Sequence, residues 1–101
     1  MAVNIVLQSE QGRMLEQVVY PIEVSDTFIP YDDESFPCLG YVDPYGDTIF
    51  NHLQMKPFLL DWARLYAVAS SEAEINFLRQ VEVLAQKCQT GVGLYLKLVG
   101  D

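Results

Sequence analysis

Apolar and polar residues alternate at the start of the chain. Val3, Ile5 and Leu7 fall on one side of residues 3–8, and Asn4, Val6 and Gln8 fall on the other. A β-strand directs successive side chains to opposite faces, so this pattern predicts a strand over residues 3–8.

A turn and a second strand are predicted next. Residues 9–12 are polar and end in Gly12, which adopts positive φ without steric cost. The second strand is predicted over residues 14–19, although its alternation is poor. A short helix starting at Arg13 is the alternative, and Pro21 ends the element in either case.

Residues 38–51 predict a β-hairpin built around a tight turn. In this turn Asp43 can accept hydrogen bonds from following amides, Pro44 sets φ, and Gly46 can adopt positive φ. The β-prone segments on either side are Leu39–Val42 and Thr48–Phe50. We therefore expect these two segments to pair with each other.

A long loop is predicted between the second strand and this hairpin. Pro21, Pro30 and Pro37 interrupt residues 20–37, and proline removes backbone donors and disfavours regular helix. Loops of this length inside compact domains are commonly functional or mobile. The loop is therefore a candidate functional segment.

A first helix is predicted from Pro57 to about Ala69. Proline is well placed in the first turn of a helix, and apolar residues follow at spacings of three and four. The apolar stripe consists of Phe58, Leu59, Trp62, Leu65, Tyr66 and Ala69. Asp61 and Arg64 fall on the other side of this helix.

A second helix is predicted from a capping box at Ser71 and Glu74 to about Gln89, with Gly91 as its stop signal. Its apolar face consists of Phe77, Leu78, Val81, Leu84, Ala85 and Cys88. The short link between the helices implies an antiparallel pair. Residues 94–99 alternate again and predict a final strand.

These elements predict one α+β domain over residues 1–101. We expect a mostly antiparallel sheet of about five strands, formed by two N-terminal hairpins and the C-terminal strand. The antiparallel helix pair should cover one sheet face, with Trp62 buried between the helices and the sheet.

The charge of the chain is strongly asymmetric. The net charge is −8, and residues 1–50 carry nine acidic residues against one basic residue. No basic residue occurs between Arg13 and Lys56. Direct binding to nucleic acid or to an anionic membrane is disfavoured because both need basic patches. A basic protein partner is favoured.

The expected location is cytoplasmic. No apolar run approaches the roughly 20 residues of a membrane span, and the first residues lack the pattern of a signal peptide. Cys38 and Cys88 are then expected to be buried thiols rather than a disulfide.

No catalytic residue, metal site or cofactor is predicted. Cys38 and His52 flank the predicted hairpin, but no third group that would orient them can be named. The carboxylates of Asp32, Asp33, Glu34, Asp43 and Asp47 match no calcium-loop spacing.

The leading hypothesis is a non-enzymatic protein-binding module that docks a basic partner through residues 20–47. Aromatic side chains would anchor the partner while carboxylates steer its approach. The predicted contact residues are Tyr31, Asp32, Asp33, Glu34, Asp43, Tyr45 and Asp47. In size, acidity and lack of catalytic motifs the chain is similar to bacterial immunity proteins, which implies an inhibitor of a basic protein.

Three other interpretations remain open. The acidic residues can serve solubility alone. A small enzyme or ligand-binding domain would place its site between the 20–37 loop and the 38–51 hairpin. A structural subunit would form homo-oligomers through a sheet edge or a helix face.

Overall fold

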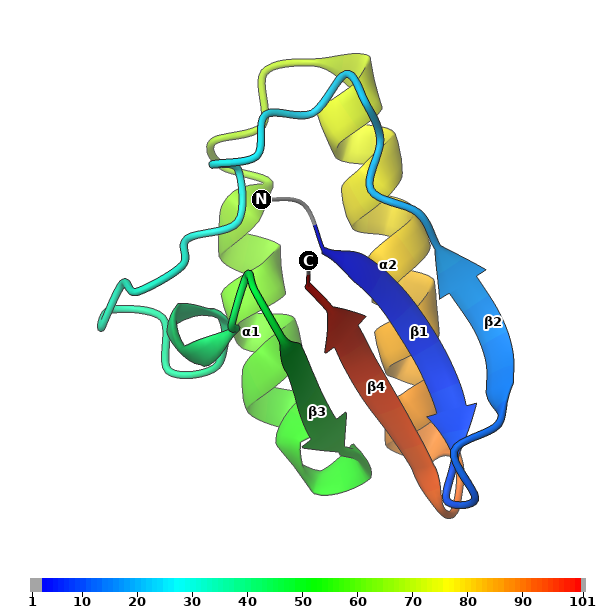
Figure 1. Cartoon of the computed structure of the whole chain (residues 1–101). Coiled ribbons are helices and arrows are strands. Elements are labelled where there is room, and N and C mark those ends of the chain that lie inside the picture. The colour runs from blue at the N-terminus through cyan, green and yellow to red at the C-terminus, as the bar shows by residue number, and fades with distance from the viewer. Residues whose placement is uncertain (1–2, 101) are drawn as a thin grey trace.

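The computed structural model describes residues 3–100 and shows a four-stranded antiparallel sheet with two helices on one face (Figure 1). The strands are β1 (Asn4–Ser9), β2 (Met14–Val18), β3 (Asp47–Asn51) and β4 (Leu94–Val99). The helices are α1 (Met55–Leu65) and α2 (Glu72–Thr90), and η1 (Leu39–Tyr41) and η2 (His52–Gln54) are single 3-10 turns. The predicted α+β class is confirmed, with four strands rather than about five.

The first two strands form the predicted hairpin. Gly12 has a φ of 82°, as its place in the turn required, and the Ser9 amide donates to the Arg13 carbonyl at 2.9 Å. The alternative of a short helix from Arg13 is wrong, because Met14–Val18 pairs with β1.

The sheet order is β2-β1-β4-β3, so the last strand in the sequence lies in the middle of the sheet. Ile5 pairs with Leu98 between β1 and β4, and Phe50 pairs with Leu96 between β3 and β4. These residues face the helices and are buried. Strand β4 therefore pairs with both β1 and β3, and all three strands contribute side chains to one core.

The predicted hairpin over residues 38–51 is wrong in its pairing. Leu39–Tyr41 forms the 3-10 turn η1, and β3 pairs with β4 instead. Leu39 and Val42 are both buried, and their spacing of three residues suits a tight helical turn better than a strand. The long alternating strand β4 offers β3 a partner already anchored in the core.

The tight turn inside this segment does form. The Asp43 carboxylate accepts from the Tyr45 amide at 2.9 Å, as predicted. Gly46, however, does not adopt positive φ. Its position is set by a contact with the chain end, because the Gly100 amide donates to the Gly46 carbonyl at 2.8 Å.

The helices follow their local signals closely. The Ser71 hydroxyl accepts from the Glu74 amide at 3.1 Å, and the Glu74 carboxylate accepts from the Ser71 amide at 3.0 Å. This confirms the capping box. Helix α1 begins two residues before Pro57 and ends at Leu65, four residues earlier than predicted. Neither helix within residues 3–100 is long and apolar enough to cross a membrane.

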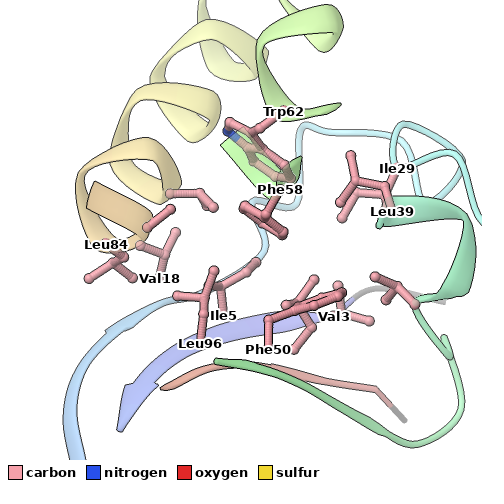
Figure 2. Close-up of a cluster of buried hydrophobic side chains, with 14 of the residues drawn as sticks. Val3, Ile5, Val18, Ile29, Leu39, Phe50, Phe58, Trp62, Leu84 and Leu96 are labelled. Carbon is pink, nitrogen blue, oxygen red and sulfur yellow. The ribbon is translucent and has the colours of Figure 1, made fainter. Parts of the chain in front are cut away.

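Trp62 lies at the centre of the core, with 1% of its surface exposed. Its indole Nε1 donates to the Leu78 carbonyl of α2 at 2.9 Å. Its ring stacks on Phe58 at 5.6 Å and meets the edge of Phe77 at 5.7 Å. Figure 2 shows Trp62 and Phe58 between α2 and the sheet, which confirms the predicted burial.

Trp62→Ala should lower the free energy of unfolding by about 3–5 kcal/mol, because it removes a buried ring and leaves a cavity. Urea denaturation followed by circular dichroism would measure the loss. Val92→Ala, at an exposed position, is the control and should change stability little. Equal stability of the Trp62 and Val92 variants would contradict the packing described here.

Candidate docking surface

The segment between β2 and β3 is irregular but well anchored. It passes along α2, crosses to the side of α1 and ends beside β3 (Figure 1). Its apolar side chains join the main core. The buried members are Tyr20, Val24, Ile29, Cys38, Leu39 and Val42. The predicted loop is therefore part of the packed structure and not a solvated linker.

Asp61 holds this segment against α1. Only 3% of its surface is exposed, and its Oδ2 atom accepts from the Cys38 amide at 2.7 Å and the Leu39 amide at 3.0 Å. Asp61 lies opposite the apolar stripe of α1, as predicted, and it is buried there because η1 covers that side of the helix. The carboxylate satisfies amides at the start of η1 that would otherwise lack partners.

Arg64, one turn further along α1, makes a second attachment. Its guanidinium lies over the Phe36 ring, 3.7 Å from the ring centroid, and donates to the Ser35 carbonyl. A guanidinium over an aromatic face is attracted by the ring's negative π-cloud. Arg64 therefore attaches residues 35 and 36 of the loop to α1.

The acidic tip of the loop, Asp32–Glu34, has a defined backbone. Asp32 adopts a φ of 59°, and its amide donates to the Gly40 carbonyl at 3.0 Å. The Asp33 carboxylate accepts from the Ser35 hydroxyl at 2.7 Å and the Ser35 amide at 2.9 Å. These two bonds lower the pKa of Asp33, so this carboxylate stays ionised.

Gly40 allows the tip to lie directly against η1. A Cβ atom at this position would collide with the Asp33 backbone carbonyl. The close approach places the tip beside Tyr41, whose side chain is 77% exposed.

The 43–47 turn continues this surface toward β3. The Asp43 amide donates to the Thr48 hydroxyl at 2.9 Å, and Asp47 forms an ion pair with Lys97 of β4 at 3.4 Å. Tyr45 is 70% exposed. The turn therefore presents a tyrosine and two carboxylates from a fixed backbone.

The predicted contact residues divide into two groups. Those exposed at the surface are Asp32, Asp33, Glu34, Asp43, Tyr45 and Asp47. Tyr31 is half-buried and packs against the core. Tyr41, which was not among the predicted contact residues, is more exposed than Tyr31 and Tyr45. We predicted Tyr41 within a strand that does not form, so its exposed position in η1 was not anticipated.

The structure brings no catalytic pair together at Cys38 and His52. Since the predicted hairpin is absent, Cys38 lies against α1 while exposed His52 begins η2 at the far end of β3. Burial, and secondarily Asp61, raises the pKa of the Cys38 thiol. Among residues 3–100 no cluster of His, Cys, Asp or Glu is arranged to hold a metal ion.

Two hollows lie along α2, away from the 43–47 turn. One of about 260 Å³ is lined by Glu16, Gln17, Val18, Gln80, Val83 and Leu84. The other, of about 380 Å³, is lined by Pro21, Glu23, Glu72, Ala73, Asn76, Phe77 and Gln80. Neither lies between the proline-containing loop and the turn, where a ligand site was the alternative expectation.

No known protein family, curated protein or solved structure gives a match to this chain. The functional argument therefore rests on the charge, exposure and geometry of its own residues.

Asp61→Ala should lower the free energy of unfolding by about 2–4 kcal/mol, because it leaves two buried amides without acceptors. Urea denaturation would measure this loss. Asp33→Ala, at an exposed turn, is the control and should cost clearly less. A loss for Asp61→Ala no larger than for Asp33→Ala would contradict the anchoring role of Asp61.

Both thiols should be unreactive in the native protein at pH 8. Burial raises the pKa of Cys88 to about 11 and also raises that of Cys38, so both stay protonated. A chromogenic disulfide reagent should react slowly with the native chain and rapidly with two thiols per chain in urea.

The same pKa shift gives a pH dependence of stability. The contribution of Cys88 is fully present below the ordinary thiol pKa of 9.0 and is lost as the pH rises toward 11. Cys88→Ala should therefore show a smaller loss of stability over this range.

For the labelling experiment, a rapid reaction of the native chain at pH 8 would contradict the burial of these thiols.

Proposed function

We propose that this protein is a protein-binding module that docks a basic partner, in the manner of an inhibitor or immunity-type protein. The contact region is the acidic loop surface, made of Asp32, Asp33, Glu34, Tyr41, Asp43, Tyr45 and Asp47. The observation that carries the proposal is the pair of strongly exposed tyrosines, Tyr41 and Tyr45, among carboxylates on a fixed backbone.

The local charge supports a basic partner. Residues 20–47 contain seven acidic residues and no basic one. The neighbouring bases are already engaged: Arg64 lies over Phe36, and Lys97 pairs with Asp47. The remaining carboxylates attract Lys and Arg side chains over about a Debye length, roughly 8–10 Å near physiological salt.

The tyrosines support docking rather than solubility alone. An acidic surface needs no exposed aromatic rings in order to repel other copies, yet Tyr41 and Tyr45 are 77% and 70% exposed. Tyrosine buries a large area at low entropic cost and is enriched among residues that dominate binding energy. A fixed loop lowers the ordering cost of association further.

The test begins with capture of partners from source cells at low salt, followed by binding kinetics with the purified partner. The double variant Asp32→Asn/Glu34→Lys changes the net charge from −8 to −5 and keeps a residue that tolerates positive φ at position 32. Its association rate should fall by about tenfold at low salt, and less at high salt.

The matched control is Glu10→Lys/Gln86→Lys, which gives the same net charge of −5 from exposed positions outside the acidic loop surface. Its association rate should fall much less. Tyr45→Ala should instead raise the dissociation rate, while Leu53→Ala, at another exposed apolar residue, should not. A partner whose kinetics ignore salt, the double variant and Tyr45→Ala would refute the proposal.

A further inference from the structure

The outer edge of β2 is open and apolar. Strand β2 is the first in the sheet order, and no strand within residues 3–100 pairs with its outer side. Large apolar residues are exposed along this strand: Met14 and Leu15 within β2, and Val19 directly after its end. An exposed apolar edge strand is a template for pairing with another strand.

The edge also lacks the charges that usually block such pairing. The one charged residue of β2, Glu16, already forms an ion pair with Lys87 of α2 at 2.7 Å. At the opposite edge, β3 begins with Asp47 and follows the acidic 43–46 turn. The two edges of the sheet are therefore chemically different.

A hollow accompanies this edge on its helical side. The space of about 260 Å³ lies between β2 and α2, and Val18, Leu84 and the half-exposed Val83 supply its apolar walls. A strand added to β2 would direct alternate side chains toward α2. The hollow is where those side chains would lie.

We infer that a second copy of this chain pairs with β2, antiparallel across a two-fold axis, and joins the two four-stranded sheets into one. Strand β2 suits itself as a partner because it offers apolar side chains and no unpaired charge. Closed two-fold dimers are the commonest assemblies of identical chains.

The acidity of the chain does not oppose this arrangement. The acidic loop surface flanks β3, at the far edge of the sheet from β2. In the joined sheet the two β3 strands would be separated by about 34 Å, seven strand spacings of roughly 4.8 Å. This distance is several Debye lengths at physiological salt, so repulsion between the acidic surfaces is largely screened.

Charge also selects the register of the pairing. A two-fold axis at Glu16 would set two carboxylates directly opposite each other, which is destabilising. An axis at Gln17 instead pairs Glu16 of one copy with Val18 of the other. We therefore place Gln17 at the axis.

The test is sedimentation velocity of the full chain over a broad concentration range. The five-residue strand is short, so we expect the mass to rise from 11.5 kDa toward twice that value at tens to hundreds of micromolar, on the order of a weak dimer. Raising the salt from low to physiological concentration should strengthen the dimer, because it screens the net charge of −8 on each copy. The proposed partner binding has the opposite salt dependence, so the two proposals fail separately.

Two variants locate the interface. Gln17→Glu is nearly isosteric and places two like charges at the axis, and Val83→Glu adds a charge beside the hollow without touching the sheet. Each should weaken the dimer by about tenfold or more. Gln89→Glu, elsewhere on α2, and Ile49→Glu, a 51% exposed residue of β3, carry the same charge change and should leave it intact.

Circular dichroism would show that every variant is folded. A single-chain mass at about 500 µM, in both low and high salt, would overturn the inference. A dimer that survives Gln17→Glu and Val83→Glu, or one that only Ile49→Glu disrupts, would overturn it as well.

Discussion

The buried carboxylate of Asp61 is the contact on which the long connection between β2 and β3 depends. It accepts two amides at the start of η1, while the next residue, Trp62, donates to α2 from inside the core. Helix α1 is thereby fixed between the core on one side and the loop on the other. The loop has no strand ladder, so its own turn hydrogen bonds shape it, while Asp61 and Arg64 of α1 attach it to the helix.

This attachment gives the candidate docking surface its rigidity. The acidic tip and the 43–47 turn each close on themselves through an aspartate that accepts a backbone amide two residues ahead. Gly40 lets the tip lie against η1 without space between them. The backbone that carries these carboxylates and tyrosines would therefore lose little conformational freedom in the proposed docking.

The sheet separates two surfaces of different chemistry. The β3 edge carries the acidic loop surface, whereas the β2 edge is apolar and its one charge is internally paired. Electrostatic attraction weakens as salt rises, while apolar strand pairing between acidic chains is helped by screening. The two proposed contacts, with a basic partner and with a second copy, would therefore use opposite edges of the sheet.

Local pattern was sufficient for much of this molecule. The alternation in residues 3–8 and 94–99, the Ser71 capping box, the apolar face of α2 and the Asp43 turn were all readable, because each depends on neighbours a few residues apart. The distribution of charge was readable because it follows directly from which residues occur in each part of the sequence. Pairing was not, because Leu39–Val42 and β4 were both possible partners for β3, and only burial of Leu39 and Val42 in the assembled core decided between them. The burial of Asp61 and the exposure of Tyr41 follow from that choice, since both depend on where η1 packs against α1.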